Sequence, residues 1–457
     1  MQERYVRYYM VSVSRGSLRM STLAEQLKSC GVVGAGGAGF PTYVKTQTEV
    51  EYLLVNGAEC EPLLHKDYEL MKHCASGIVQ GAKAMRSATR ARYARFGVKS
   101  KNAAAVEAIQ ASIAGTDMDT VLLGDFYPSG DEFELVYSGT GRLIPPGGIP
   151  LAVGCVVINV ETLYNVARAV DGHPVTHKFL SVTGAVRKPK SFWAPVGTSF
   201  RELLAAAGGT TTADYGFFIS GIMMGRLSFD LDDVVTKTTG GLIVLPRDHY
   251  LIVRKERPQQ SMRRIGKSAC DQCSFCTEFC PRYLLGYDVQ PHKVMRSLGF
   301  TASGAALWNQ SAELCCACGL CTLYACPEDL YPKEACDQAK HDLREAGTKY
   351  VQKNAPLVHP MKDSRRVPLA MLRRRLKVED YEAETPFEDV KLTPSRVRIL
   401  LKQHAGQAAV AVVRVGDRVR AGERIGDLEG NRLGAAIHSS IDGTVKAVTD
   451  AAIEIAS

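Results

Sequence analysis

The sequence has little of what marks a membrane or secreted protein. No uncharged apolar run approaches the roughly 18 residues that a membrane span requires. The N-terminal stretch MQERYVRYYMVSVSRGSLRMSTLAEQL contains arginines but no continuous apolar segment and no small-residue cleavage site. We therefore expect no signal peptide and no integral membrane association. Residues 1–20 are expected to form a flexible extension, with a targeting tail or a misassigned start as alternatives.

Charge of one sign is also scarce. The formal net charge is +8 over 457 residues, and basic runs such as Arg373-Arg374-Arg375 have no interleaved aromatic residues. Nucleic-acid binding is therefore not expected, and a solvated face or an acidic docking partner explains these runs. A content of 46% hydrophobic and 23% charged residues is typical of a soluble globular protein. The length predicts roughly three or four domains.

Cysteine, in contrast, is plentiful, and its spacing is regular. Without a secretory signal, the 14 cysteines indicate metal ligands rather than disulfides. One run, followed by Pro281, has the C-x2-C-x2-C-x3-C-P spacing of bacterial ferredoxins. A second run, followed by Pro327, has one additional residue before its last cysteine. The two runs consist of Cys270, Cys273, Cys276 and Cys280, and of Cys315, Cys318, Cys321 and Cys326.

These runs resemble those of two-cluster ferredoxins, in which the last cysteine of each run binds the other cluster. By that resemblance, one [4Fe-4S] cluster would be held by Cys270, Cys273, Cys276 and Cys326, and the second by Cys315, Cys318, Cys321 and Cys280. A structural zinc site is the alternative. Cys316 breaks the spacing and is expected to be a neighbour only. Buried reduced thiols are expected for Cys30, Cys60, Cys74, Cys155 and Cys336.

The stretch GVVGAGGAGFPTYVK at residues 31–45 matches G-x-G-x-x-G, and Glu59 follows at the distance of a dinucleotide fingerprint. A dinucleotide loop, however, follows a strand and opens into a helix. Here the preceding STLAEQLKSCG predicts a helix, only Val32 and Val33 remain for a strand, and Phe40-Pro41 interrupts the downstream side. The glycines still let the backbone approach a phosphate or a flat ring. A mobile hinge is the alternative.

Two further segments give the glycine loop a context. VEYLLVNGAECEP at residues 50–62 predicts a strand that ends in a polar turn, and GCVVINVETL at residues 154–163 predicts a strand that runs into a helix. In this order, the three motifs resemble the flavoprotein subunit of respiratory complex I and the C subunit of the Rnf electron-transport complex. That family shares a G-x-G-G-A-G-F-P-T loop, an N-x-x-E-x-E-P turn and an N-V-E-T-L segment.

The resemblance implies a binding site for FMN with NADH stacking on its ring. It implies a backbone bed at Gly34, Gly36, Gly37 and Gly39, a cation near the phosphate at Lys45, polar flavin contacts at Asn56, Glu59, Asn159 and Thr162, and NADH-side residues at Phe40 and Glu61. The chain departs from the complex I pattern at Ala58, where that pattern is acidic, and at Ile158-Asn159, where it has two asparagines. Each departure affects a single contact.

The rest of the chain predicts further modules in a multi-domain α/β protein. Residues 178–209 alternate at first, end in an amphipathic helix and resemble a β-grasp, soluble-ligand-binding module. Residues 396–457 alternate short valine-rich strands with turns and resemble a barrel-sandwich hybrid without a carrier lysine. The expected domains are a Rossmann-like FMN/NADH-binding domain (21–175), the β-grasp domain (176–255), a helical two-cluster ferredoxin-like domain (256–345), a linker (346–395) and the barrel-sandwich hybrid (396–457).

This order of modules, with the sandwich last, resembles the family of cobalamin reductases from propanediol-utilisation microcompartments. The resemblance implies an oxidoreductase in which electrons pass from NADH through FMN and two [4Fe-4S] clusters to the cobalt of a corrinoid, for reactivation of a B12-dependent diol dehydratase. It also implies a cytoplasmic location inside a bacterial microcompartment, with an adenosyltransferase and shell proteins as candidate partners. The alternatives are an NADH:ferredoxin or quinone subunit of an Rnf-like membrane complex, and a cluster scaffold without flavin chemistry.

Overall fold

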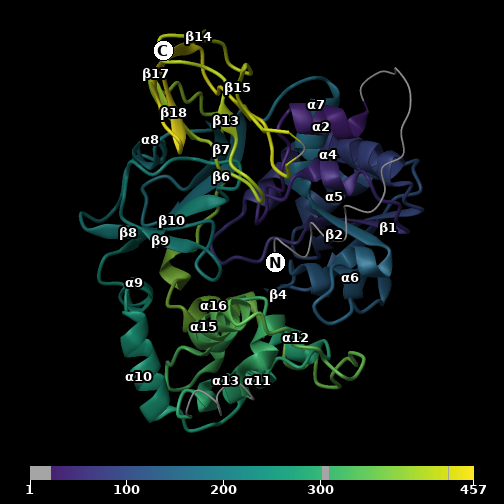
Figure 1. Cartoon of the computed structure of the whole chain (residues 1–457), viewed down its shortest axis with the longest axis vertical. Coiled ribbons are helices and arrows are strands. Elements are labelled where there is room, and N and C mark those ends of the chain that lie inside the picture. The colour runs from purple at the N-terminus through teal and green to yellow at the C-terminus, as the bar shows by residue number, and fades with distance from the viewer. Residues whose placement is uncertain (1–21, 301–307, 431) are drawn as a thin grey trace.

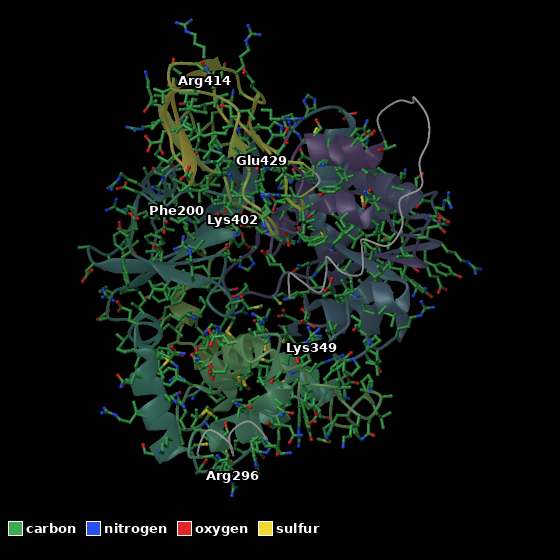
Figure 2. All side chains as sticks on the ribbon, in the orientation of Figure 1. Phe200, Arg296, Lys349, Lys402, Arg414 and Glu429 are labelled. Carbon is green, nitrogen blue, oxygen red and sulfur yellow. The ribbon has the colours of Figure 1, made fainter. Side chains whose placement is uncertain are left out.

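The computed structural model describes residues 22–300, 308–430 and 432–457, so the expected N-terminal extension at 1–20 lies outside the described residues. The molecule is elongated, with the C-terminal strands near one end of its long axis and the helices of the cysteine-rich region at the other (Figure 1). Exposed Arg414 and Arg296 mark these two ends (Figure 2). No helix in the described segments is long and apolar enough to cross a bilayer.

The α/β unit, residues 22–175, is built on a four-stranded parallel sheet in the order β3-β2-β1-β5. Along β1, Leu53 and Val55 join the core on one face, while Leu54 joins the core on the other. Both faces are therefore covered, as is usual for parallel strands. The strands are β1 (Tyr52–Gly57), β2 (Tyr93–Lys99), β3 (Asp119–Leu123) and β5 (Cys155–Asn159).

Helices cover this sheet on both sides. The core against the first face takes side chains from α2, α4, α5 and α7. The core against the second face takes side chains from α6 and η1. Thr22 caps α2 in a capping box with Glu25, and Asn159 caps α7. The bounds are α2 (Leu23–Ser29), α3 (Thr42–Lys45), α4 (Lys66–Thr89), α5 (Ala103–Ile113), α6 (Glu132–Thr140), η1 (Pro150–Val153) and α7 (Val160–Val170).

The order of the strands creates a switch point between β1 and β5. From β1 the chain proceeds to β2 on one side, whereas β5 is added on the other. Asn56 and Asn159 are register partners at the carboxyl ends of these strands. In open α/β sheets, ligands bind in the crevice at such a point. The topology therefore marks the place where two of the sequence motifs meet.

The mixed-sheet unit, residues 176–255, has a five-stranded sheet in the order β7-β6-β10-β8-β9. Both faces of its first strand are covered, because β6 is buried from residue 178 to residue 183. Phe179 packs in the core of the α/β unit, whereas Leu180 and Val182 pack in the unit's own core with Phe200. The elements are β6 (His177–Gly184), β7 (Lys190–Pro195), α8 (Phe200–Ala206), β8 (Tyr215–Ile219), β9 (Arg226–Ser228), β10 (Gly241–Pro246) and α9 (Tyr250–Lys255).

The cysteine unit, residues 256–345, consists of short helices and loops. It contacts the α/β unit directly, because the Tyr127 hydroxyl donates to the Cys318 carbonyl at 2.7 Å and the Tyr287 hydroxyl to the Ile144 carbonyl at 2.7 Å. The elements are α10 (Gln259–Ala269), α11 (Phe275–Glu278), α12 (Pro281–Leu284), α13 (Pro291–Ser297), η2 (Gln310–Leu314), η3 (Cys321–Ala325) and α15 (Pro332–Glu345).

The segment 346–395, expected as a linker, is packed against the other units. Its strand β11 (Val367–Pro368) pairs antiparallel with β4 (Phe126–Tyr127) of the α/β unit. Leu369 and Leu372 of helix α16 (Leu369–Arg375) are buried together with residues of the mixed-sheet and cysteine units. A short turn of helix, η4 (Glu379–Tyr381), follows. The segment therefore joins three units through buried contacts.

The C-terminal unit, residues 396–457, has two facing antiparallel sheets. They consist of β12 (Arg396–Leu400), β14 (Arg418–Val419), β17 (Gly443–Val448) and β18 (Ala452–Ala456), and of β13 (Val410–Ala411), β15 (Arg424–Asp427) and β16 (Ile437–His438). Buried Lys237 of the mixed-sheet unit donates to the Ala436 carbonyl at 2.8 Å and to the Gly31 carbonyl at 2.8 Å. One lysine thus connects three units beside the glycine loop.

Candidate functional site

The glycine loop folds back on itself instead of joining a strand to a helix. The Gly34 amide donates to the Phe40 carbonyl at 2.9 Å, and Val33 forms an isolated bridge with Pro41. Gly36 and Gly37 are exposed at its tip. A Cβ at Gly37 would meet no atom within 4 Å, whereas a Cβ at Gly36 would lie 2.9 Å from the Asn159 side chain. The loop therefore rests on Asn159 and leaves an open backbone surface beside it.

Hydrogen bonds from residues outside the loop hold its backbone in place. The Ala35 amide donates to the Thr162 hydroxyl of α7 at 2.9 Å, and Lys178 of β6 donates to the Ala35 carbonyl at 3.2 Å. From the C-terminal unit, the Ala405 amide donates to the Gly39 carbonyl at 3.0 Å. Thr162, predicted as a flavin contact, is thus an anchor of the loop. Three units hold the loop in place over the switch point.

Behind the loop lies a buried network of charges that the sequence motifs did not reveal. Lys66 contacts Asp67 at 2.5 Å and Glu161 at 3.2 Å, and Lys178 also pairs with Glu161. Burial disfavours the charge of Lys66, but Asp67, Glu161 and Glu59 outweigh it and hold its pKa above its usual range. Glu161 belongs to the N-V-E-T-L segment, and that motif was the one signal in the sequence that could have pointed to this network.

The predicted polar residues at the switch point are linked to this network. The Asn159 side-chain amide donates to Asp67 at 2.8 Å, and the Asp67 backbone amide donates to the Glu59 carboxylate at 2.9 Å. Burial, followed by the nearby Asp67 charge, raises the pKa of Glu59 to about 8. The Asn56 side-chain amide donates to the Gly130 carbonyl at 2.9 Å. The structure therefore brings Asn56, Glu59 and Asn159 together.

Three other predicted residues have contacts of a different kind. Lys45 donates to the Val157 carbonyl at 2.8 Å, and burial lowers the pKa of its ammonium group. Phe40 packs with Val44 and Ile149 in a small apolar cluster at the base of the loop. Glu61 accepts from the Met223 amide at 3.0 Å and the Met224 amide at 2.9 Å, so its carboxylate is directed at the mixed-sheet unit.

Burial of Glu61 should make the protein less stable as the pH rises. Burial raises the pKa of Glu61 from 4.5 to about 7, and the two backbone amides oppose this shift only in part. Because the folded state binds this proton more tightly than the unfolded chain, the contribution to stability is complete below pH 4.5 and is lost as the pH rises through about 7. It amounts to roughly 3 kcal/mol. The melting temperature of Glu61→Gln should therefore fall less than that of the unaltered protein between about pH 5 and about pH 8. Equal slopes for both proteins would contradict this assignment.

Removing Lys178 should destabilise the loop and the sheet beneath it. Lys178→Met leaves one excess negative charge among fully buried Glu161, Asp67 and Lys66, which should cost about 3 kcal/mol in the free energy of unfolding. Lys178→Met/Glu161→Gln removes the excess charge and should recover part of the loss. Arg201→Met breaks an exposed pair with Asp232 and should cost about 1 kcal/mol or less. Denaturant unfolding measures all three variants. A loss in Lys178→Met no larger than in the exposed control would refute the role of the network.

The structure brings the last cysteine of each run close to cysteines of the other run, and the predicted pairing defines two groups: Cys270, Cys273, Cys276 and Cys326, and Cys315, Cys318, Cys321 and Cys280. The Cys276 thiol has its pKa raised to about 12 by burial and then by Cys326, Cys270 and Cys273. The Cys321 thiol has its pKa raised by burial and then by Cys315, Cys276 and Cys280. The pKa of Cys318 is raised by Cys316, burial, Cys280 and Cys321. Cys326 therefore lies with the first run, and Cys280 lies with the second.

The backbones of the two runs match position by position. The second and fourth residues after the first cysteine have positive φ in both runs: Gln272 (62°) and Ser274 (64°) in one, Ala317 (58°) and Gly319 (83°) in the other. Non-glycine residues adopt this region rarely. The turns direct donors at sulfur, since the Ala317 amide donates to Cys315 Sγ at 3.3 Å. The two runs thus form equivalent wrapping loops.

The donor set fits iron-sulfur clusters. Thiolates are the ligands of such clusters, and N–H groups aimed at the sulfurs help to set their potentials. Within the segments that the structure describes, no three His, Cys, Asp or Glu side chains converge on one ion position. Two further thiols lie beside the second group, because Cys316 contacts Cys318, and Cys336 contacts Cys315.

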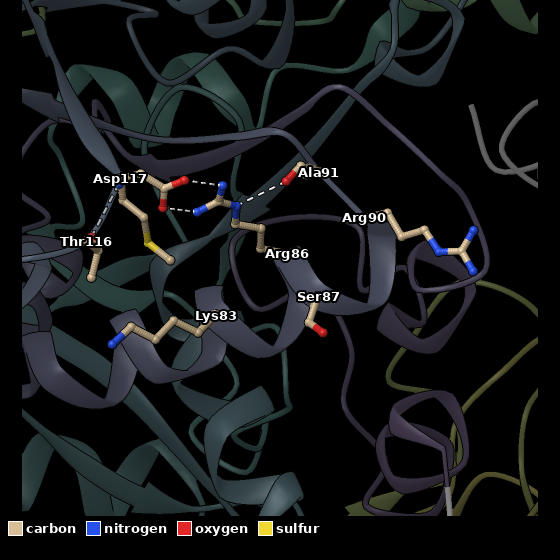
Figure 3. A pocket seen from close by; sticks show the side chains of 8 residues that line it. Lys83, Arg86, Ser87, Arg90, Ala91, Thr116 and Asp117 are labelled. Carbon is tan, nitrogen blue, oxygen red and sulfur yellow. Dashed lines mark hydrogen bonds and ion pairs between the residues drawn. The ribbon is translucent and has the colours of Figure 1, made fainter.

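A separate hollow of about 440 Å³ lies at the C-terminal end of α4 (Figure 3). It is lined by Lys83, Arg86, Ser87, Arg90, Ala91, Thr116, Asp117 and Met118. Asp117 accepts from Arg86 Nη2 at 2.6 Å and from Nη1, and lies across the hollow as an ion pair. Its lining residues include none of the predicted site residues.

Four family models match separate parts of the chain. They are the Nuo51 FMN-binding domain at residues 27–168, the SLBB domain at 179–226, a 4Fe-4S dicluster domain at 269–331 and the RnfC barrel sandwich hybrid domain at 377–457. The glycine loop and both polar motifs lie within the first match, and all eight predicted ligand cysteines lie within the third. These matches confirm a multi-domain α/β protein with an FMN-binding and an iron-sulfur domain.

Two curated proteins are similar over nearly the whole chain. Cobalamin reductase PduS of Salmonella typhimurium is 40% identical over 440 residues, which cover 96% of this chain and 97% of that protein. Cobalamin reductase PduS of Citrobacter freundii is 38% identical over 436 residues, or 95% and 96%. A solved NAD⁺-reducing [NiFe]-hydrogenase in its H2-reduced state is 20% identical, with a TM-score of 0.46, over 77% of this chain and 66% of that chain. From the near-full-length similarity to the two curated proteins, the chain belongs to the cobalamin reductase PduS family.

Proposed function

We propose that this chain is an oxidoreductase that transfers electrons from NADH to the cobalt of a corrinoid, with FMN and two [4Fe-4S] clusters as cofactors. The observation that carries the proposal is the similarity to two proteins named cobalamin reductase over at least 95% of the chain. The matches to an FMN-binding domain and a 4Fe-4S dicluster domain support it.

Two regions of the chain would hold the cofactors, one for FMN and one for the clusters. When bound, FMN takes up an electron pair from a nicotinamide and releases single electrons, which iron-sulfur clusters accept. Gly34, Gly36, Gly37 and Gly39 would provide the backbone bed for FMN, and Asn56, Glu59 and Asn159 the polar side chains at the switch point. The exposed tip of the loop would leave room for NADH beside a bound flavin. The eight cysteines named above would hold the clusters, and no general acid or base is required.

The test is NADH-dependent reduction of aquacobalamin by the anaerobically purified full-length protein. Its spectrum should contain the blue-region bands of oxidised flavin together with broad cluster absorption, and cobalamin reduction should depend on NADH. Reduction of ferredoxin or a quinone without reduction of corrinoid would support the Rnf-like alternative instead. Cluster absorption without flavin bands would support a scaffold.

The physiological setting is a further part of this proposal. Reduction of corrinoid cobalt would precede its adenosylation and serve a B12-dependent diol dehydratase. A cytoplasmic microcompartment, its shell proteins and a cobalamin adenosyltransferase are the setting and partners that follow from the family resemblance. Co-purification of the tagged protein with such an adenosyltransferase tests the partner. Absence of the tagged protein from isolated compartments would refute the location.

A further inference from the structure

Arg282 is a buried cation between the cysteine unit and the α/β unit. It is 6% exposed and follows the predicted ligand Cys280 by two residues. Its Nη2 pairs with the Asp131 carboxylate at 2.9 Å, and its guanidinium carbon lies 3.4 Å from the centre of the Phe133 ring. Asp131 is the N-cap of α6 and also accepts from the Phe133 amide at 3.0 Å. The guanidinium group is therefore held on one side by an element of the α/β unit.

On its other side, the guanidinium faces the second group of cysteines. Its side chain interacts with the Cys316 thiol both by charge and by a hydrogen bond, and Cys316 in turn contacts Cys318. Its Nη1 is buried and has no hydrogen-bond partner among the described residues. A buried donor without a partner costs about 1–3 kcal/mol, so such a group calls for an explanation. An anionic sulfur cluster in the second group of cysteines would provide acceptors at this place.

Backbone N–H groups also donate to a cysteine of the second group. The amides of Arg282 and Tyr283 donate to the Cys280 thiol. The first group of cysteines has a different neighbour, since Arg254, which lies near Cys326, donates to the backbone carbonyls of Thr322 at 2.9 Å and Leu330 at 2.6 Å. A buried cation that faces cysteine sulfur, rather than backbone carbonyls, is thus a feature of the second group.

We propose that Arg282 raises the reduction potential of the cluster held by Cys280, Cys315, Cys318 and Cys321 by presenting a fixed positive charge and an N–H donor to its sulfur ligands. Net charge and hydrogen bonds to sulfur are two of the factors that set such potentials. The proposal rests on the proposed function, because it requires that this group of cysteines holds a cluster. Asp131 and Phe133 fix the orientation of the guanidinium and compensate for its burial.

The test is an anaerobic redox titration of the full-length holoprotein, followed by electron paramagnetic resonance. In Arg282→Met, the one-electron reduction equilibrium of one cluster should shift about tenfold towards the oxidised form, or about 59 mV. The other cluster should keep its potential. Arg282→Lys should restore part of the shift, because it retains the charge but loses the planar donors. Lys237→Met is the matched control, since it removes a buried cation whose charge interacts with Cys30 and with none of the predicted ligands.

The outcomes separate the two proposals. Iron analysis that finds no clusters in the unaltered protein would refute the proposed function, whereas intact clusters with unchanged potentials in Arg282→Met would refute the role of Arg282. If Arg282→Met does not fold, Arg282→Met/Asp131→Asn removes both members of the buried pair and is titrated in its place. As a measurement that needs no substitution, arginine labelled with ¹⁵N in the guanidinium should couple to the reduced cluster in hyperfine spectra, and a spectrum without that coupling would overturn the proposal.

Discussion

Replacing Cys326 by serine should remove the cluster that it shares with the first run. The other cluster, held by Cys315, Cys318, Cys321 and Cys280, should remain, although three of its ligands belong to the same run as Cys326. The reason is spatial, since Cys326 interacts with Cys273 and Cys276, while Cys280 of the first run lies with Cys321. Each single ligand substitution should lower the bound iron by about half, because each cluster contains four of the eight irons. Iron and sulfide analysis of the anaerobically purified protein measures the loss.

Double substitutions test the exchange of ligands more sharply. Cys276→Ser/Cys326→Ser affects a single cluster and should lose no more iron than either single variant. Cys276→Ser/Cys280→Ser affects both clusters and should lose nearly all of the iron, although both cysteines belong to one run. Cys74→Ser is the control, because this partly buried thiol of α4 lies in neither group. The opposite pattern, with Cys276 and Cys280 behaving as one unit, would mean that each run binds its own cluster.

The features that the sequence could predict are those encoded by a local pattern of residues. The capped helix after Thr22, the strand through Leu53 to Val55 and the strand that runs into α7 at Asn159 each follow from a local pattern of apolar residues and caps. The cysteine spacing is equally local. The family matches confirm the FMN-binding and iron-sulfur domains that the resemblance implied, whereas the individual FMN and cluster residues stay predictions.

The features that sequence could not predict depend on contacts between distant residues. Burial of both faces of β6 is one example, because Phe179 is covered by the α/β unit while Leu180 and Val182 are covered by their own unit. The charges of Lys66 and Lys178 balance Glu161 across three separate segments, so no period along the chain reveals them. The connecting segment 346–395 has the composition of a linker but pairs with β4. Each of these features is a property of the interface between units.

Enlarging Gly37 should strongly weaken FMN binding without changing the fold. The Cβ of Gly37→Val enters the open space beside the glycine loop, where no atom lies within 4 Å, so the cofactor-free protein should keep its melting temperature. A flavin on this backbone would be displaced by the side chain, since only glycine permits so close an approach. We expect FMN binding to weaken by about a hundredfold or more, or roughly 3 kcal/mol. Flavin fluorescence titration of the cofactor-free protein measures the dissociation constant.

Gly36 provides the contrast that distinguishes a binding surface from a structural position. A Cβ at Gly36 would lie 2.9 Å from the Asn159 side chain, which itself donates to Asp67 at 2.8 Å. Gly36→Ala should therefore disturb the loop and the buried charges beneath it, and should lower both the melting temperature of the cofactor-free protein and its affinity for FMN. Gly37→Ala should have an effect on affinity between those of glycine and valine. If Gly37→Val binds FMN as tightly as the unaltered protein, the flavin lies elsewhere, and if it melts as early as Gly36→Ala, the loop has only a structural role.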